Sequence, residues 1–164
     1  MERSDHNIST FVTKTDQQNV VKTRSENLGV SAKRRIATDI YFPFNNAFNT
    51  SITTLDALQL CSAAHTSTNG GSSQSNRGTS PFSPVAVEAT RILGKKFLTN
   101  TDQRIPEIEF DTLIIPEDLT EPAIELISSI GKVDTALNNP NFHKGRYKVL
   151  HSIWMNDTNN WFMV

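Results

Sequence analysis

The chain has 164 residues, enough for one domain, and 37% of them are hydrophobic. Its formal net charge of -1 excludes a strongly basic nucleic-acid-binding chain and an acidic tail. The single cysteine, Cys61, excludes a disulfide framework within the chain and fits a reducing environment. No apolar run approaches the ~20 residues that cross a bilayer, and the first residues lack the apolar core of a signal peptide.

Residues 1–26 are polar and rich in Ser, Thr, Asn and Gln. We expect them to form an extended arm or loop that is ordered only by a partner surface. A helical period then begins after Ser25, a reasonable N-terminal cap, with apolar residues at Leu28, Ala32, Ile36 and Ile40. Pro43 should kink or end this helix before Phe48.

The next segments alternate apolar runs with irregular stretches. Leu55–Ser62 is a short apolar run that predicts a strand. Residues 66–83 are rich in Gly, Ser and Asn and predict a mobile surface loop. Ser83 followed by Pro84 is a strong start signal for a helix over 84–98. The run Phe110–Pro116 predicts a buried strand that ends at proline.

A second helix is expected over 119–130. Asp118 or Thr120 would cap its start and Gly131 its end. Residues 132–146 predict a polar loop, and 147–150 and 161–164 predict two strands. Because the last of these stops at Val164, we expect the chain to be cut inside a domain.

The charges are unevenly distributed. Residues 1–35 carry seven basic and four acidic side chains, whereas the segment between Arg104 and Lys132 holds seven acids and no base. A basic arm and an acidic face could attract each other between neighbouring subunits. The alternative is two solvated faces without a partner.

Two pairs of histidine or cysteine residues are candidate chemical sites. Cys61 and His65 are four residues apart, a spacing that suits two metal ligands or a thiol nucleophile with its base. A packed thiol beside a polar histidine fits better, since no further ligand pair or activating group follows. His143 and His151 are eight apart with no acids in step.

Other polar patterns are weaker still. Glu107, Glu109 and Asp111 alternate and could share a strand face as paired carboxylates, although a solvated edge is favoured. Gly70-Gly71 and the run 76–79 do not form a phosphate loop, which needs Gly-x-x-x-x-Gly-Lys-Ser/Thr between a strand and a helix. The sequence therefore gives no catalytic, cofactor-binding or metal-binding residue, and it does not predict an enzyme.

An ordered series of segments carries a resemblance that covers about four fifths of the chain. The series is Asn45-Asn46-Ala47-Phe48, then Leu58 to His65, Asn76-Arg77-Gly78-Thr79, Ser83 with Ala86 and Ala89, Asp111 to Pro116, Leu119, Ala123, Ser128, Asn141-Phe142, Gly145 to Val149 and Trp161-Phe162. It resembles the major capsid (head) protein of Mu-like tailed bacteriophages. No single motif is specific; the ordered series is.

The resemblance implies an α+β chain of the Hong Kong 97-type phage capsid fold, incomplete, with a spine helix and part of the axial domain. Residues 1–26 would be an N-terminal arm or loop remnant, 27–65 the spine helix with part of the peripheral domain, and 66–164 part of the axial domain, truncated at its C-terminus. The spine helix would cover 27–42, and 132–146 would lie near a loop facing the capsomer centre.

The implied function is that of a structural subunit of an icosahedral phage head. Its partners would be copies of itself in hexamers and pentamers, packaged double-stranded DNA bound without sequence specificity, and scaffold, portal or decoration proteins, with no membrane and no cofactor. It would be located in the virion capsid after assembly in the bacterial host cytoplasm. The alternatives are an encapsulin-like nanocompartment shell protein and, from a different class, a small Cys/His hydrolase.

Overall fold

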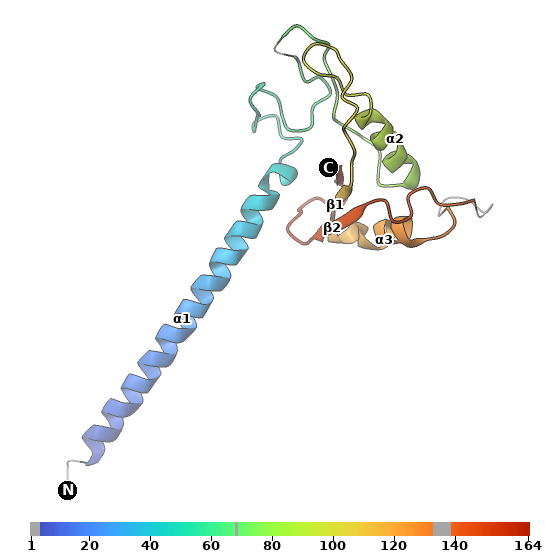
Figure 1. The fold of residues 1–164 in the computed structure, drawn as a ribbon. Coiled ribbons are helices and arrows are strands. Elements are labelled where there is room, and N and C mark those ends of the chain that lie inside the picture. Colours follow the sequence, from blue (N-terminus) through green and yellow to red (C-terminus); the bar gives the residue numbers. More distant parts are fainter. Residues whose placement is uncertain (1–3, 68, 133–138) are drawn as a thin grey trace. The chain divides into compact units, whose positions relative to one another are not determined.

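The structure is a computed structural model that describes the backbone of residues 4–67, 69–132 and 139–164, with side chains from residue 19 onward in those ranges. The chain divides into two compact units, Met1–Ile40 and Tyr41–Val164. The described part of the first unit is a single helix, and the second unit holds the remaining helices and the sheet (Figure 1).

Helix α1 runs from Ser4 to Asn45. This finding corrects the expectation of an extended arm over residues 1–26. Ser25 does not cap the helix but lies inside it, and its hydroxyl donates to the carbonyl of Val21 at 3.0 Å. Residues 4–28 contain neither proline nor glycine. Once a helix has nucleated, adding a residue without such a breaker costs little, so a polar segment can continue it.

The C-terminal end of α1 agrees with its sequence. Pro43 was expected to kink or end the helix before Phe48, and α1 ends two residues beyond Pro43, at Asn45. The backbone N–H and the side-chain amide of Asn46 both donate to the carbonyl of Phe42, at 3.1 and 3.0 Å. The helix therefore closes with one of its last carbonyls satisfied.

The expected strand over 55–62 is wrong, because this run is irregular. The backbone N–H of Thr54 donates to the carbonyl of Leu58 at 2.7 Å, and the Asp56 carboxylate accepts from the backbone N–H of Leu58 at 3.2 Å. An aspartate that bonds its own backbone two residues on favours a turn over a strand. Ala57 completes the turn with φ of 61°.

The Gly/Ser-rich connection has no helix or strand among its described residues, as expected, but it is anchored. An isolated bridge joins His65 to Gln74. The side chain of Gln74 forms two hydrogen bonds with the backbone of Leu98, at 2.8 and 2.7 Å. The loop is thereby fixed to the segment that follows the next helix.

Helix α2, Pro84–Gly94, begins as its sequence predicts. The Ser83 hydroxyl accepts a hydrogen bond from the backbone N–H of Ala86 at 3.2 Å, and Pro84 occupies the first turn. The helix ends at Gly94, four residues before the expected end at Leu98. A Cβ at Gly94 would lie 2.1 Å from the ring of Phe110, so glycine allows this close approach.

The sheet has three strands in the order β2-β1-β3. Strand β1, Thr112–Pro116, is central; β2, Lys148–Ser152, runs parallel to it, and β3, Phe162–Met163, runs antiparallel. The three predicted strands near these positions are confirmed, with bounds shifted by one or two residues. The chain is mixed helix and sheet, as the α+β prediction requires.

Between β1 and β2 the chain forms a short 3-10 helix, η1, Glu117–Leu119, and then α3, Thr120–Ser128. The second predicted helix is confirmed, but its expected caps are wrong. Leu119 is the N-cap and makes no side-chain hydrogen bond. The 3-10 turn already provides a carbonyl acceptor, that of Glu117, for the backbone N–H of Thr120.

At the other end of α3, Ser129 rather than Gly131 is the C-cap. The side-chain amide of Asn141 donates to the carbonyls of Leu126 and Ser129, at 2.6 and 3.1 Å. These bonds satisfy carbonyls that a glycine cap would otherwise serve. The expected polar loop over 132–146 lies partly outside the described residues, since 133–138 are not described.

The core of the second unit consists of two apolar clusters that share strand β1. Leu113 and Ile115 belong to one cluster, and Ile114 belongs to the other. Side chains alternate along a strand, so the two clusters lie on opposite faces of the sheet. The first cluster also contains Val87, Ala123, Leu126 and Tyr147, and the second contains Ala47, Cys61, Met155 and Phe162.

None of the helices in the described ranges combines the length and apolar character needed to cross a membrane.

Candidate functional site

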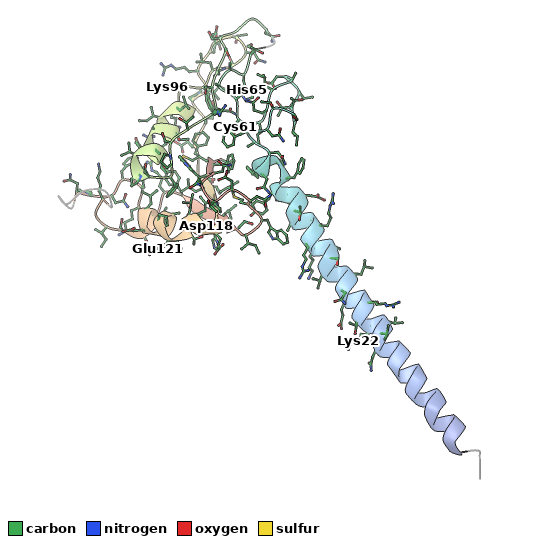
Figure 2. All side chains as sticks on the ribbon, turned by 180° about the vertical axis from the view of Figure 1, so that it is seen from behind. Lys22, Cys61, His65, Lys96, Asp118 and Glu121 are labelled. Carbon is green, nitrogen blue, oxygen red and sulfur yellow. The ribbon has the colours of Figure 1, made fainter. Side chains whose placement is uncertain are left out.

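Cys61 and His65, the candidate thiol and base, both lie in the irregular segment between α1 and α2 (Figure 2). Both ring nitrogens of His65 have other partners: Nδ1 lies 2.5 Å from the Asp56 carboxylate, and Nε2 lies 3.1 Å from the Asn76 side-chain oxygen. Cys61 is buried, and burial raises the pKa of its thiol, although Arg77 acts in the opposite direction. A raised pKa disfavours the thiolate that a nucleophile requires.

The amide of Asn76 has a fixed orientation. Its oxygen accepts from the backbone N–H of Ser62 at 2.8 Å, and its nitrogen donates to the carbonyl of Leu60 at 2.8 Å. His65 therefore lies between two oxygen acceptors, Asp56 and Asn76. We call these three residues the Asp56–His65–Asn76 cluster. It joins three parts of an irregular segment, and sequence spacing alone did not indicate it.

The Asp56 carboxylate is the negatively charged group of this cluster. It accepts a short hydrogen bond from the Thr54 hydroxyl as well as the contact with His65. The Thr54 hydroxyl, followed by His65, lowers the pKa of Asp56 from 3.8 to about 2. Hydrogen bonds to the charged form favour that form, so Asp56 is ionised at neutral pH.

The acidic candidates do not share a strand face, because β1 begins only at Thr112. Glu109 pairs with Lys95 at 3.1 Å, and Asp111 lies 3.9 Å from Lys148. Both pairs are partly exposed and contribute little to stability. Glu107 is exposed. The acids are thus dispersed among separate surface contacts.

His143 and His151, the histidine pair eight residues apart, have different environments. His151, on β2, pairs with Glu117 at 2.8 Å and is exposed, whereas His143 is buried. Within residues 19–67, 69–132 and 139–164, no three His, Cys, Asp or Glu side chains converge in a metal-ligand arrangement.

The glycine pair in the Gly/Ser-rich loop has a packing role. Gly70 has a φ of 79°, and a Cβ at Gly71 would lie 2.6 Å from the carbonyl oxygen of Asn100. The backbone N–H of Ser72 donates to the Asp102 side chain at 2.7 Å. These contacts attach the loop to the turn around residues 99–103. In the run 76–79, the other segment compared with a phosphate loop, the Arg77 guanidinium lies 5.6 Å from the centre of the Phe48 ring.

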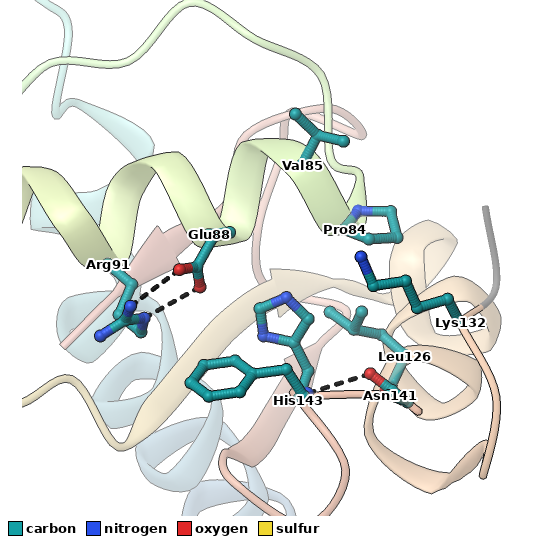
Figure 3. Close-up of a pocket in the computed structure, with 9 residues that line it drawn as sticks. Pro84, Val85, Glu88, Arg91, Leu126, Lys132, Asn141 and His143 are labelled. Carbon is teal, nitrogen blue, oxygen red and sulfur yellow. Dashed lines mark hydrogen bonds and ion pairs between the residues drawn. The ribbon is translucent and has the colours of Figure 1, made fainter. Parts of the chain in front are cut away.

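A cavity of about 400 Å³ lies between helix α2, helix α3 and the segment after α3 (Figure 3). We call it the α2–α3 pocket. Pro84, Val85 and Leu126 provide apolar walls. Its polar walls are the side chains of Glu88, Arg91, Lys132, Asn141 and His143, and the ring of Phe142 completes the lining.

The ionic groups of the α2–α3 pocket are arranged around one ion pair. Arg91 donates two hydrogen bonds to Glu88, at 2.9 and 2.7 Å, and these bonds lower the pKa of Glu88. Arg91 and Arg146 also lie 5.3 and 4.1 Å from the centre of the Phe142 ring. The aromatic ring is therefore held beside two guanidinium groups.

His143 is the buried polar residue of this pocket, with 7% of its surface exposed. Figure 3 shows its ring between Glu88 and Leu126. Its Nδ1 atom has no hydrogen-bond partner among the described residues, and the same holds for the neighbouring Tyr147 hydroxyl. Burial lowers the pKa of His143, and the nearby carboxylate of Glu88 opposes this shift.

A larger cavity of about 790 Å³ has several aromatic side chains in its walls. Phe44, Phe48, Phe97, Phe110 and Trp161 contribute to it, together with the buried Cys61. The Trp161 indole donates to the carbonyl of Ser80 at 3.1 Å. Several of the lining residues also belong to the second apolar cluster or pack against it, so the cavity lies beside that cluster.

Exposed apolar side chains gather at one edge of the sheet. Leu150 is 51% exposed and Ile153 is 73% exposed. Leu150 pairs with Ile114 in the ladder, on the face that the second cluster covers elsewhere. No strand among the described residues pairs with the outer edge of β2. We call Leu150, Ile153 and this edge the β2 edge surface.

The first unit also exposes apolar residues. Leu28, Ile36 and Ile40 of α1 are 72%, 60% and 59% exposed. They recur at multiples of four residues and form a stripe along the helix. Helices in proteins owe most of their stability to a packed apolar face, so such a stripe is suited to an intermolecular contact.

Comparison with known proteins identifies no relative: no family model matches the sequence, and neither a curated protein nor a solved structure is significantly similar to it.

Proposed function

We propose that this chain is a structural subunit of an icosahedral phage head with the Hong Kong 97-type capsid fold. The observation that carries the proposal is the ordered series of segments between Asn45 and Phe162 that resembles Mu-like major capsid proteins. Segments of modest individual specificity in the same order are much less expected by chance than any one of them.

The surfaces of the molecule support this proposal. The β2 edge surface offers unpaired backbone groups beside exposed apolar side chains, a combination that favours pairing with another chain. The stripe on α1 offers a second apolar surface. In a closed symmetric assembly, contacts of this kind are repeated by every copy, so each needs to contribute only modestly.

The domain assignments form part of the proposal. Residues 27–42 would be the spine helix, and α2, β1 and α3 would belong to the axial domain. The subunit would form hexamers and pentamers around double-stranded DNA in the virion, with assembly in the bacterial host cytoplasm. Scaffold, portal or decoration proteins would be its other partners.

The test is the assembly state of the purified product of the gene that encodes this chain. Sedimentation velocity should detect species of capsomer size or larger, and electron microscopy should show closed shells of uniform size. A product that stays monomeric across a wide range of protein and salt concentrations would contradict the proposal.

The same experiment separates the alternatives. Shells that enclose an enzyme rather than DNA would indicate an encapsulin-like nanocompartment. A solitary protein with a measurable turnover that is lost on alkylation of Cys61 would indicate the hydrolase. The geometry gives that last alternative no support, because the Nε2 atom of His65 contacts the Asn76 side-chain oxygen and not the Cys61 thiol.

A further inference from the structure

We propose that the α2–α3 pocket binds a small organic carboxylate with a compact apolar body. This binding site is independent of the capsid proposal, since its walls lie within one copy of the second unit.

The size and the apolar walls of the pocket determine how large the non-polar part of the ligand can be. A cavity of about 400 Å³ lies at the small end of the range that small-molecule sites occupy. Pro84, Val85 and Leu126 form an apolar wall, and the Phe142 ring offers an aromatic face. The volume suits a molecule of one ring or a short branched chain.

The charges around the pocket favour an anionic head group. Arg91, Arg146 and Lys132 act on His143 as cations, and Glu88 is the opposing carboxylate. Glu88 is already neutralised by its two hydrogen bonds with Arg91. Arg146 forms no ion pair within the part of the chain that the structure describes. Positive charge therefore remains available for a ligand carboxylate.

His143 places a buried, ionisable side chain in the lining of the pocket. Buried polar atoms are nearly always hydrogen-bonded, so an unpartnered atom beside a cavity requires an explanation. The Nδ1 atom of His143, a residue that lines the pocket, is such an atom within the described ranges. Because Nδ1 itself is shielded from solvent, a ligand would act on the His143 ring through its charge and not through a bond to this atom.

The ligand also has an electrostatic effect on His143. Burial lowers the pKa of the imidazole. A carboxylate in the pocket would favour the charged imidazolium and raise this pKa, because an opposite charge nearby stabilises the charged form. Glu88 and Arg91 from α2, and Lys132, Arg146 and Tyr147 from the later segment, are the other titratable groups around the ring.

The test uses 4-fluorobenzoate as the probe, with 4-fluorobenzyl alcohol as its uncharged analogue. Ligand-observed fluorine NMR suits both a monomer and a large assembly. We expect saturable binding of the carboxylate and at least tenfold weaker binding of the alcohol. Equal binding of the two probes, or no saturable binding of either, would overturn the proposal.

Two matched lysine variants locate the site. Lys132→Gln removes a cation from the pocket wall and should weaken 4-fluorobenzoate binding about fivefold, the size expected for a partly exposed ion pair. Lys144→Gln removes an exposed lysine outside the lining and should leave binding unchanged. Equal effects of the two substitutions would place the probe elsewhere and overturn the assignment. Shell formation is read out separately, so either proposal can fail alone.

Discussion

The Asp56–His65–Asn76 cluster holds the irregular segment after α1 through side-chain hydrogen bonds. Its strength depends on an ionised Asp56, whose folded-state pKa of about 2 lies below its ordinary value of 3.8. A carboxyl with a depressed folded pKa contributes stability above its unfolded pKa and loses it as pH falls through the folded value. This contribution should therefore be present above about pH 4 and disappear toward pH 2.

Replacing the strongest partner of Asp56 tests this account. Thr54→Val removes the hydroxyl that lowers the Asp56 pKa most, so the pKa should rise from about 2 toward 3.8. Carbon-detected NMR titration of the Asp56 carboxyl measures the change. Thr50→Val, at an exposed threonine in the same segment, is the control and should leave the titration unaltered. An Asp56 titration that is the same in both variants would show that the Thr54 hydroxyl is not the cause.

Sequence reasoning selected Cys61 and His65 at this site and missed Asp56 and Asn76. The partners of His65 lie nine and eleven residues away in a segment without periodicity. Helical and strand periods predict which residues share a face, but no such rule applies to a turn held by side chains. The only local signal for a turn here was Asp56 itself, because an aspartate side chain often accepts a hydrogen bond from a nearby backbone N–H group.

At the scale of elements, the start of α2 depends on one hydroxyl. Ser83→Ala removes the acceptor for the backbone N–H of Ala86, and we expect it to reduce the free energy of unfolding by about 1 kcal/mol. Urea denaturation, monitored by a signal from the helices and sheet of the second unit, measures this loss in the free energy of unfolding. Ser80→Ala is the matched control, because Ser80 is exposed and its hydroxyl has no hydrogen bond among the described residues. A loss no larger than that of the control would contradict the capping role.

Elements with strong local signals were predicted well. The Ser83-Pro84 pair and the apolar run of β1 each specify their element through nearby residues. The N-terminal half of α1 has no such signal: it is helical although its sequence is polar. The caps of α3 were mispredicted for a related reason, since Asn141, far along the chain, serves its final carbonyls. Long-range partners of this kind leave no local pattern.

For the whole molecule, the sequence predicted the general class, mixed helix and sheet, and three strand positions. It did not predict that β1 would be central, with β2 parallel on one side and β3 antiparallel on the other. Strand order depends on which apolar faces meet after the chain closes. One consequence is that β2 is left at an edge, where Leu150 and Ile153 remain exposed.

If the capsid proposal holds, the β2 edge surface is one place where copies meet. The double variant Leu150→Lys/Ile153→Lys should shift sedimentation toward smaller species, because two desolvated charges at a contact oppose association. Both side chains are exposed in the single chain, so its stability in urea should change little. The double variant Asn156→Lys/Thr158→Lys adds the same charge at exposed polar positions after β2 and serves as the control. Wild-type assembly by the Leu150/Ile153 variant would remove this edge from the contacts between copies, whereas equal disruption by both variants would indicate general repulsion between positively charged subunits.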